Sequence, residues 1–309
     1  MKEASQAEAP LDELLIGVWQ AQGRVGFLLR SPEAAQIEIR ELEDPVSEVR
    51  FRFRWIPHRE LRTDVAELEA RGILDPGRDV SKLYRDPRDP SERFCFLCPA
   101  NIRECNPMEE LVPIRLAGKG YYAGANFAWI SRDHFTVMAA DHTDQIFDSN
   151  ALHAMLDLHA QTGGRFRVVY NAPDAGATIP WHLHFQITTE AFPIEHLPPG
   201  SEVDYPTALR RFPADPGRGA ALEYVSEWAR RDPEHHRVNV MVSGPKESPT
   251  IYVFVRDTRR SHAADKGLMG GFEVCGDFIF SEPDKRNIFE QASGDLARTL
   301  LAAVRPPGT

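Results

Sequence analysis

The alternation of apolar and polar positions predicts a chain of mixed helices and strands. Apolar residues recur at helical spacing over residues 11–23 and 144–161, which indicates two amphipathic helices. Residues 49–55 instead alternate with a period of two, which is typical of a strand with one buried face. The other face of that strand carries Arg50, Arg52 and Arg54. These arginines form either an anion-binding face or an ordinary solvated one.

Further elements follow from the same two periods. The pattern predicts strands at residues 36–40, two within 121–137, and one each at 166–171, 237–243, 250–256 and 272–280, with helices at 220–231 and 287–304. Residues 1–10 are polar and rich in alanine, so we expect them to be disordered, and residues 72–93 read as a loop. Proline, glycine and charged residues dominate residues 198–219, which indicates a domain boundary or a lid.

A short run near the middle of the chain concentrates side chains that can do chemistry. His182, His184 and Gln186 stand two residues apart and would project from one face of a strand, with the intervening apolar residues toward a core. A neutral imidazole can attack phosphorus and form a covalent intermediate, and a neighbouring amide can donate to a phosphoryl oxygen. The alternative is a buried strand whose histidines are only hydrogen-bonded.

Composition limits the classes of function. The chain has 309 residues and 42% hydrophobic content, enough for a substantial core. Its sequence contains neither an apolar run of membrane-spanning length nor an opening that resembles a signal peptide, so we expect a cytoplasmic protein without a membrane partner. The formal net charge of -10 disfavours a general nucleic-acid surface. Any phosphate site must therefore be local.

Two of the four cysteines form a C-x-x-C motif, Cys95 and Cys98. This spacing allows two thiolates to bind one tetrahedral Zn²⁺, with histidine as the expected source of the remaining ligands. A redox pair is the competing interpretation, although no thioredoxin-like context surrounds the motif. Cys105 lies close by and is an alternative ligand.

The run His182-Leu-His184-Phe-Gln186 resembles the active-site strand of the histidine-triad superfamily. The resemblance is to the branch that holds galactose-1-phosphate uridylyltransferase, diadenosine tetraphosphate phosphorylases and GDP-hexose phosphorylases. It implies that His184 becomes nucleotidylated and that Gln186 contacts the transferred phosphoryl group. The implied fold is α+β of the HIT-like (GalT-like) type, with antiparallel sheets, flanking helices and two degenerate repeats. Residues 11–200 would form the catalytic half with the zinc knuckle, and residues 201–309 the degenerate second half.

The same resemblance assigns a structural zinc site and a phosphate fork. By position in the family pattern, Cys95, Cys98, His134 and His182 would hold the zinc. Arg59 and Arg62 lie in a Pro-His-Arg-x-x-Arg segment that is similar to one that binds the nucleotide's phosphates in this branch. Two arginines three residues apart are suited to such a fork.

Other residues take implied roles around the nucleotide. Phe96 and Leu97 would line the base pocket, with ordinary packing as the alternative. Asn171 matches an asparagine near the reacting phosphate, and Thr178 stands near a serine that binds it. The second half offers its own candidate contacts to the acceptor, Asn239, Arg256 and Glu273.

The implied activity is that of a nucleotidyltransferase or phosphorylase working by a ping-pong mechanism. A nucleoside di- or polyphosphate would donate its nucleotidyl group to His184, and phosphate or a phosphorylated acceptor would then take it. Leu183 and Phe185 stand where uridylyltransferases mostly have proline and a small residue, so the strand is more similar to that of the phosphorylases. The second half also lacks the His-rich sugar-site segment of those transferases, which disfavours a hexose-1-phosphate acceptor. The alternatives are a zinc-stabilised nucleotide-binding protein without turnover, a HIT-type hydrolase, and a metal-dependent hydrolase. Family members are often dimers, so a homodimer is expected by resemblance.

Overall fold

The computed structural model describes residues 9–47, 49–74, 95–197, 204–231, 237–257, 262–263 and 266–307. An eight-stranded sheet forms their centre, in the order β3-β4-β5-β7-β6-β9-β10-β8, and all its neighbouring strands are antiparallel. Its strands are β3 (Leu111–Leu116), β4 (Lys119–Ala125), β5 (Phe135–Ala139), β6 (Arg167–Asn171), β7 (His184–Thr188), β8 (Ala208–Pro213), β9 (Val238–Ser243) and β10 (Thr250–Val255). Most of the expected disordered segment 1–10 and of the expected loop 72–93 lies outside the described residues.

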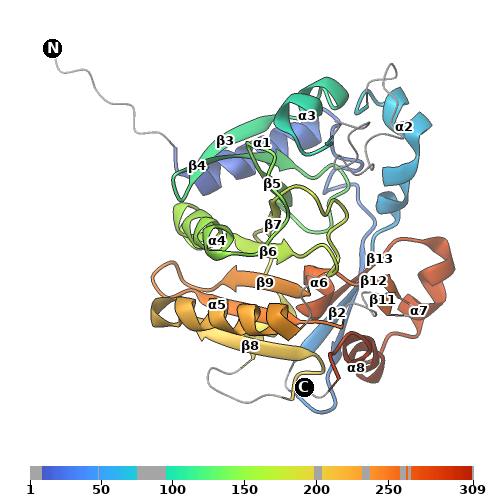
Figure 1. The fold of residues 1–309 in the computed structure, drawn as a ribbon. Coiled ribbons are helices and arrows are strands. Elements are labelled where there is room, and N and C mark those ends of the chain that lie inside the picture. Colours follow the sequence, from blue (N-terminus) through green and yellow to red (C-terminus); the bar gives the residue numbers. More distant parts are fainter. Residues whose placement is uncertain are drawn as a thin grey trace.

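The sheet continues across the expected boundary between the two halves. β6 pairs with β9, with Val168 opposite Val242 and Asn171 opposite Asn239. Figure 1 shows the strands of both halves stacked in one sheet. The proposed halves 11–200 and 201–309 therefore share their backbone hydrogen bonding.

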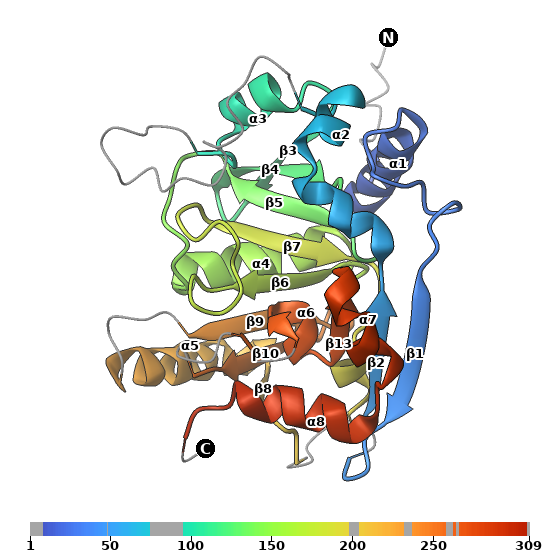
Figure 2. The same ribbon diagram turned by 90° about the vertical axis from the view of Figure 1, so that its right-hand side faces the viewer.

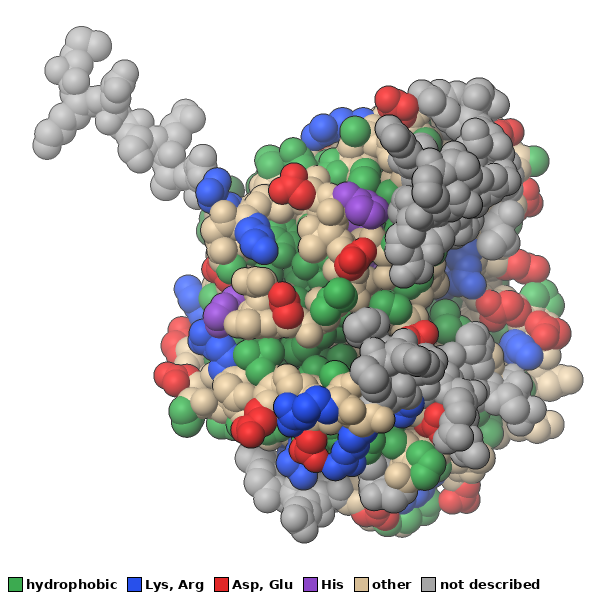
Figure 3. Space-filling model, viewed as in Figure 1, with side chains coloured by type: hydrophobic (Ala, Val, Ile, Leu, Met, Phe, Trp, Pro, Cys, Tyr) green, Lys and Arg blue, Asp and Glu red, His purple; other side chains and the backbone are tan. Residues whose placement is uncertain are grey.

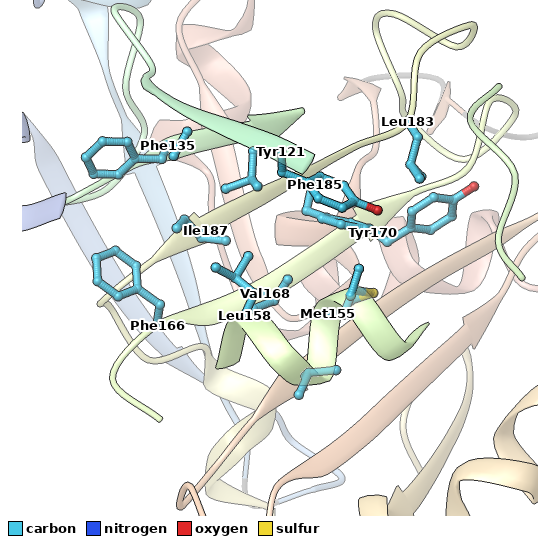
Figure 4. Packing of buried hydrophobic residues seen from close by; sticks show 14 of the residues in the cluster. Tyr121, Phe135, Met155, Leu158, Phe166, Val168, Tyr170, Leu183, Phe185 and Ile187 are labelled. Atoms are coloured by element: carbon cyan, nitrogen blue, oxygen red, sulfur yellow. The ribbon is translucent and has the colours of Figure 1, made fainter. Parts of the chain in front are cut away.

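Three helices cover one face of the sheet. They are α1 (Leu11–Arg24), α4 (Ser149–Gln161) and α5 (Ala214–Arg231), and their buried residues form one apolar cluster with the strands. α4 begins where the Asp148 side chain accepts the Ala151 N–H, and it presents Met155 and Leu158 to the strands. Figure 4 shows these side chains beside Phe185 and Val168. This face therefore holds the main core.

The opposite face of the eight-stranded sheet is covered by a separate set of elements over the second half. Over the second half lies a small sheet, β1-β2-β13, together with two helices, and these elements form a separate apolar cluster. The elements are β1 (Glu38–Glu43), β2 (Arg50–Trp55), β13 (Asp277–Phe280), α6 (Gly271–Val274) and α8 (Gly294–Ala303). Figure 2 shows β2 and β13 side by side although they lie far apart in the sequence.

Neither interpretation of the three arginines of β2 holds, because two of them are paired with a carboxylate of the protein. Arg54 is only 2% exposed, and its guanidinium donates to both oxygens of Asp277 on β13 at 2.8 to 3.0 Å. Arg52 also reaches Asp277, at 3.3 Å. Because β13 is parallel to β2, the Asp277 carboxylate lies where two of the three cations can share it.

Two expected elements in the second half are divided. The expected strand at 272–280 starts as the short helix α6, because the Glu273 carboxylate accepts the Gly270 N–H and closes a first turn. The expected helix at 287–304 is α7 (Arg286–Glu290) followed by α8, with Ser293 capping the second helix through the Leu296 N–H. The remaining elements are α2 (Val65–Ala70), α3 (Pro99–Cys105), the 3-10 helices η1 (Pro57–Thr63), η3 (Pro193–His196) and η5 (Pro283–Lys285), and the short strands β11 (His262–Ala263) and β12 (Gly267–Leu268).

The surface carries charges of both signs. On the face seen in Figure 3, Lys and Arg side chains gather near α5 with acidic side chains among them. Within the described ranges, none of the helices combines the length and apolar content that a bilayer span requires.

Candidate active site and metal centre

β7 divides its side chains between the core and the site. Phe185 and Ile187 are completely buried in the main core, on the side of α4 (Figure 4). Because successive strand residues point to opposite faces, His184 and Gln186 lie on the other face. The strand begins at His184, so His182 belongs to the segment that precedes it rather than to the strand itself.

His184 is held in one orientation by a neighbouring carbonyl. Its imidazole is 5% exposed, and its Nδ1–H donates to the backbone oxygen of His182 at 2.8 Å. The proton on Nδ1 leaves the lone pair on Nε2. Burial lowers the pKa of His184 to about 4, so the ring is neutral near pH 7.

A pocket of about 310 Å³ opens on this face of the sheet. Six residues expected from the sequence line it: Arg59, Arg62, Asn171, Thr178, Gln186 and Glu273. The second half supplies the facing wall, including Lys266, Glu273, Glu282 and Lys285. His184 is not among the described residues that line the pocket.

The two arginines reach the pocket from η1. Residues three apart on a 3-10 helix eclipse one another, so Arg59 and Arg62 point the same way. Arg59 donates to the backbone oxygen of Ala128, and Arg62 lies 3.4 Å from Glu282. Burial, followed by the positive charge of Arg62, lowers the pKa of Arg59 to about 9. An anionic ligand would offset the cost of burying this guanidinium.

The loop after β6 packs closely against the second half. A Cβ at Gly176, which has φ +97°, would lie 2.6 Å from the Gly270 Cα and 2.7 Å from the Met269 oxygen. The Asn171 Oδ1 accepts the Gly271 N–H at 2.8 Å. The pocket is therefore formed where the two halves meet.

Of the three expected acceptor contacts, only Glu273 lines the pocket. Asn239 and Arg256 lie beneath it and are buried. The Asn239 amide donates to the Asn171 Oδ1 at 2.8 Å and to the Ala175 oxygen at 2.7 Å, and Arg256 donates to the Asn239 Oδ1 at 3.2 Å. These two side chains support the loop that carries Gly176.

Four side chains converge beside this site: Cys95, Cys98, His142 and His182. Their ligand atoms all lie within 4.8 Å of one another. The Cys95 Sγ is 3.4 Å from His182 Nδ1, and the Cys98 Sγ is 3.4 Å from His142 Nδ1. Two ligands of a tetrahedral zinc at ordinary Zn–S and Zn–N lengths would stand roughly 3.5 Å apart.

The orientation of His182 also fits a metal ligand. Its Nε2–H donates to the Ala139 oxygen at 2.9 Å, which leaves Nδ1 unprotonated toward the two cysteines. The neighbouring Cys95 thiol, as a hydrogen-bond donor, lowers the pKa of Cys98 to about 4. Two thiols and two imidazoles are the donor set that zinc prefers, so the cluster can bind a metal.

Comparison with known proteins gives the fold. Residues 52–189 match the family model of a domain of unknown function (DUF4922). No match is found among curated proteins. Among solved structures, the chain is similar over nearly its full length to yeast Ap4A phosphorylase Apa2. One structure of Apa2 is 17% identical with a TM-score of 0.63, over 98% of this chain and 99% of that one.

Two further structures of the same yeast protein also match. Apa2 in complex with AMP is 18% identical with a TM-score of 0.59, over 98% of both chains. Apa2 in complex with Ap4A is 15% identical with a TM-score of 0.58, over 97% of this chain and 99% of that one. The chain has the HIT-like (GalT-like) fold. This agrees with the α+β class expected from the sequence.

The HIT-like fold places His134, the expected fourth zinc ligand, away from the metal cluster. Its Nδ1 accepts the Ile130 N–H at 3.2 Å, and its ring lies against Phe272 of the second half. His142 joins the cluster in its place. His134 precedes β5 and His142 follows it, so roughly 16 Å of strand separates the two ends.

The pairing of β5 with β7, which the sequence alone did not show, accounts for the presence of His142 in the cluster. Met138 of β5 is paired with His184 of β7, and the strands are antiparallel. The residues just after β5 therefore lie beside the residues just before β7, where His182 stands. Of the two Asp-His pairs in this region, only Asp141-His142 satisfies that condition.

The remaining expected residues lie in apolar surroundings. Leu97 is buried in a small cluster with Ile102, Met138, Ile179 and Trp181, and Phe96 packs against the same cluster. Neither lines the pocket described above. Cys105 is buried in the main core and is not part of the metal cluster.

Proposed function

We propose that this protein transfers a nucleoside monophosphate from a nucleoside polyphosphate to inorganic phosphate through a covalent intermediate on His184. The observation that carries the proposal is the orientation of His184. Its Nδ1–H is committed to the His182 oxygen, so the lone pair of Nε2 is on the side away from that contact. Gln186 stands two residues along the same strand face and lines an arginine-bearing pocket.

The reaction would proceed in two displacements. In the first, the His184 Nε2 attacks the α-phosphorus, a nitrogen–phosphorus bond forms, and the bond to the bridging oxygen breaks, so that the remaining phosphate chain leaves with the electron pair. In the second, an oxygen of inorganic phosphate attacks the same phosphorus, and the nitrogen–phosphorus bond breaks. A nucleoside diphosphate is released and the neutral imidazole is restored.

The pocket residues have separate tasks in this scheme. Arg59 and Arg62 offset the charge on the phosphate chain, and Arg62 exchanges its contact with Glu282 for a phosphate oxygen. The Gln186 amide donates to the transferred phosphoryl group. Asn171, at the end of β6, and Thr178, in the loop that follows, approach the same group.

The substrate class is supported by the structural neighbours. Apa2 is named as an Ap4A phosphorylase and has been solved with AMP and with Ap4A. We extend only the nucleotide class to this chain. The four cations of the pocket wall, Arg59, Arg62, Lys266 and Lys285, suit a donor with several phosphates.

A metal would have a structural task. Cys95, Cys98, His142 and His182 would hold zinc in a closed four-coordinate site. When bound, the ion would tie the α3 knuckle to the segment that leads into β7. The steps at His184 use the protein's own side chains.

A second candidate function is nucleotide binding without turnover. The observation that favours it is that His184 is 5% exposed and is not among the described residues that line the pocket. In that case the pocket would bind the nucleotide and Nε2 would not reach the α-phosphorus.

One experiment separates these functions. The zinc-loaded protein is incubated briefly with nucleoside triphosphates or dinucleoside polyphosphates, and its intact mass is measured beside His184→Ala. We expect a nucleoside-monophosphate adduct on the wild type that phosphate removes, and none on the variant. Tight nucleotide binding with no adduct under any donor would establish the second function instead.

A further inference from the structure

The ladder between β6 and β7 stops two residues before His184. The last paired residues are Val169 and Gln186, and the same register would bring Asn171 opposite His184. The Gln145 side chain fills this gap. Its Nε2 donates to the Asn171 oxygen at 2.8 Å and to the His184 oxygen at 3.1 Å, while its Oε1 accepts the His184 N–H at 2.8 Å.

Gln145 is itself buried and is held in place by a hydrogen bond to its backbone. It is 1% exposed, and the Tyr170 hydroxyl donates to its backbone oxygen at 2.9 Å. Tyr170 is completely buried and lies between Phe147 and Phe185. The amide thus satisfies three buried backbone groups, each of which would cost about 1–3 kcal/mol if left unpaired.

The same segment runs beside the metal cluster and the two histidines. The Ala139 oxygen accepts from His182, and the Thr143 oxygen accepts the Leu183 N–H at 2.6 Å. Residues 139–145 therefore supply hydrogen-bond partners to His182, Leu183 and His184. His184 stands opposite Met138 of β5 on one side, and both of its backbone groups are hydrogen-bonded to the Gln145 side chain on the other.

We propose that Gln145 is the positioning residue for His184: it fixes the peptide of His184 on both its N–H and its carbonyl, and thereby sets the direction of the imidazole. The inference rests on the proposed function insofar as His184 is the nucleophile. Gln145 contacts only the backbone of His184, and so it acts through that residue. A displacement of about 1 Å at a nucleophile can cost on the order of 100-fold in rate.

The test uses Gln145→Met, which keeps the length of the side chain and removes its hydrogen bonds. Tyr170→Phe is the second variant, because it removes only the hydroxyl that anchors the Gln145 backbone. Gln22→Ala is the matched control, since Gln22 is also buried and its Oε1 accepts a backbone N–H, that of Glu110 at 3.3 Å. Gln22 lies on α1, in the main core.

Two measurements are made on each zinc-loaded variant. The first is the rate of adduct formation at saturating nucleoside polyphosphate, beside the dissociation constant for the nucleotide. For Gln145→Met we expect this rate to fall by about 10- to 100-fold while the dissociation constant stays within about threefold. The second is the ¹⁵N spectrum of the His184 imidazole, which should change from a single Nδ1–H tautomer to a mixture.

The imidazole spectrum keeps the two proposals separate. If the wild type forms no adduct, the proposed reaction fails, but the ¹⁵N resonances still show whether Gln145 sets the ring. Unchanged His184 resonances in Gln145→Met would overturn the positioning role, whatever the adduct rate. If Gln145→Met does not fold, the His184 resonances of Tyr170→Phe test the positioning role instead, and unchanged resonances would overturn it. Gln22→Ala should leave the His184 resonances unchanged.

Discussion

His182 and His184 are two residues apart, but their imidazoles are held in opposite tautomers. The Ala139 carbonyl takes the proton of the His182 Nε2, whereas the His182 carbonyl takes that of the His184 Nδ1. The strand period predicts that the two rings share a face, but it does not show which carbonyl each ring will meet. The chemical difference between the two residues therefore comes from one tertiary contact, with Ala139, and one local contact, with the backbone of His182.

His58 makes the stability of the protein depend on pH. It is buried against Trp129, with ring centroids 4.7 Å apart. Burial lowers its pKa to about 4, with smaller contributions from Arg59 and Arg30, whereas an unfolded histidine titrates near 6.5. Below about pH 6.5 only the unfolded chain takes up the proton, so stability present at neutral pH is lost as the pH falls toward 4.

We expect His58→Gln to lose less stability than the wild type on acidification. Between about pH 7 and pH 5 the difference should be about 2 kcal/mol in the free energy of unfolding. Urea unfolding of both proteins at each pH measures it. Between about pH 7.5 and pH 8.5 the free energy of unfolding should change equally in the two proteins. An equal loss of stability in acid would contradict the assigned burial of His58.

At the scale of elements, the position of each histidine relative to β5 determines whether it lies beside Cys95 and Cys98. The periodicity predicted a strand here, and the C-x-x-C spacing indicated a metal site near Cys95 and Cys98. The choice between His134 and His142 depends on which end of β5 adjoins the start of β7, and that follows from the sheet order. Strand pairing is a long-range property, so local pattern alone does not supply it.

The metal content of two histidine variants tests the ligand set. His142→Ala should lose most of its zinc in the presence of a competing chelator, because it removes one of four donors. His134→Ala should keep about one equivalent, since that ring bonds to the Ile130 N–H. Elemental analysis of the dialysed proteins gives the result. Loss of zinc from His134→Ala alone would reverse the assignment.

At the scale of the whole molecule, the α+β class was predictable and the single continuous sheet was not. Apolar runs such as residues 237–243 indicated strands, but nothing local showed that β9 would pair with β6. The consequence is a close contact between the halves at Gly271. A Cβ there would lie 2.3 Å from Val169 Cγ1 and 2.7 Å from Asn171 Oδ1.

We expect Gly271→Ala to be destabilised by about 1–3 kcal/mol, because the added methyl overpacks this contact. Gly17→Ala on α1 is the control, since a Cβ there meets nothing within 4 Å and alanine is the better helix residue. Its stability should rise by roughly 0.5–1 kcal/mol. Thermal or urea unfolding compares the three proteins, and equal stability for Gly271→Ala would show that the contact is loose.

The pocket has two walls that come from distant parts of the sequence. One comes from η1, β6 and β7, and the other from β12, α6 and η5 more than 75 residues later in the sequence. Substitutions in the later wall leave β7 untouched. In such an arrangement a substitution in the later wall can change what the pocket accepts without altering any residue of β7.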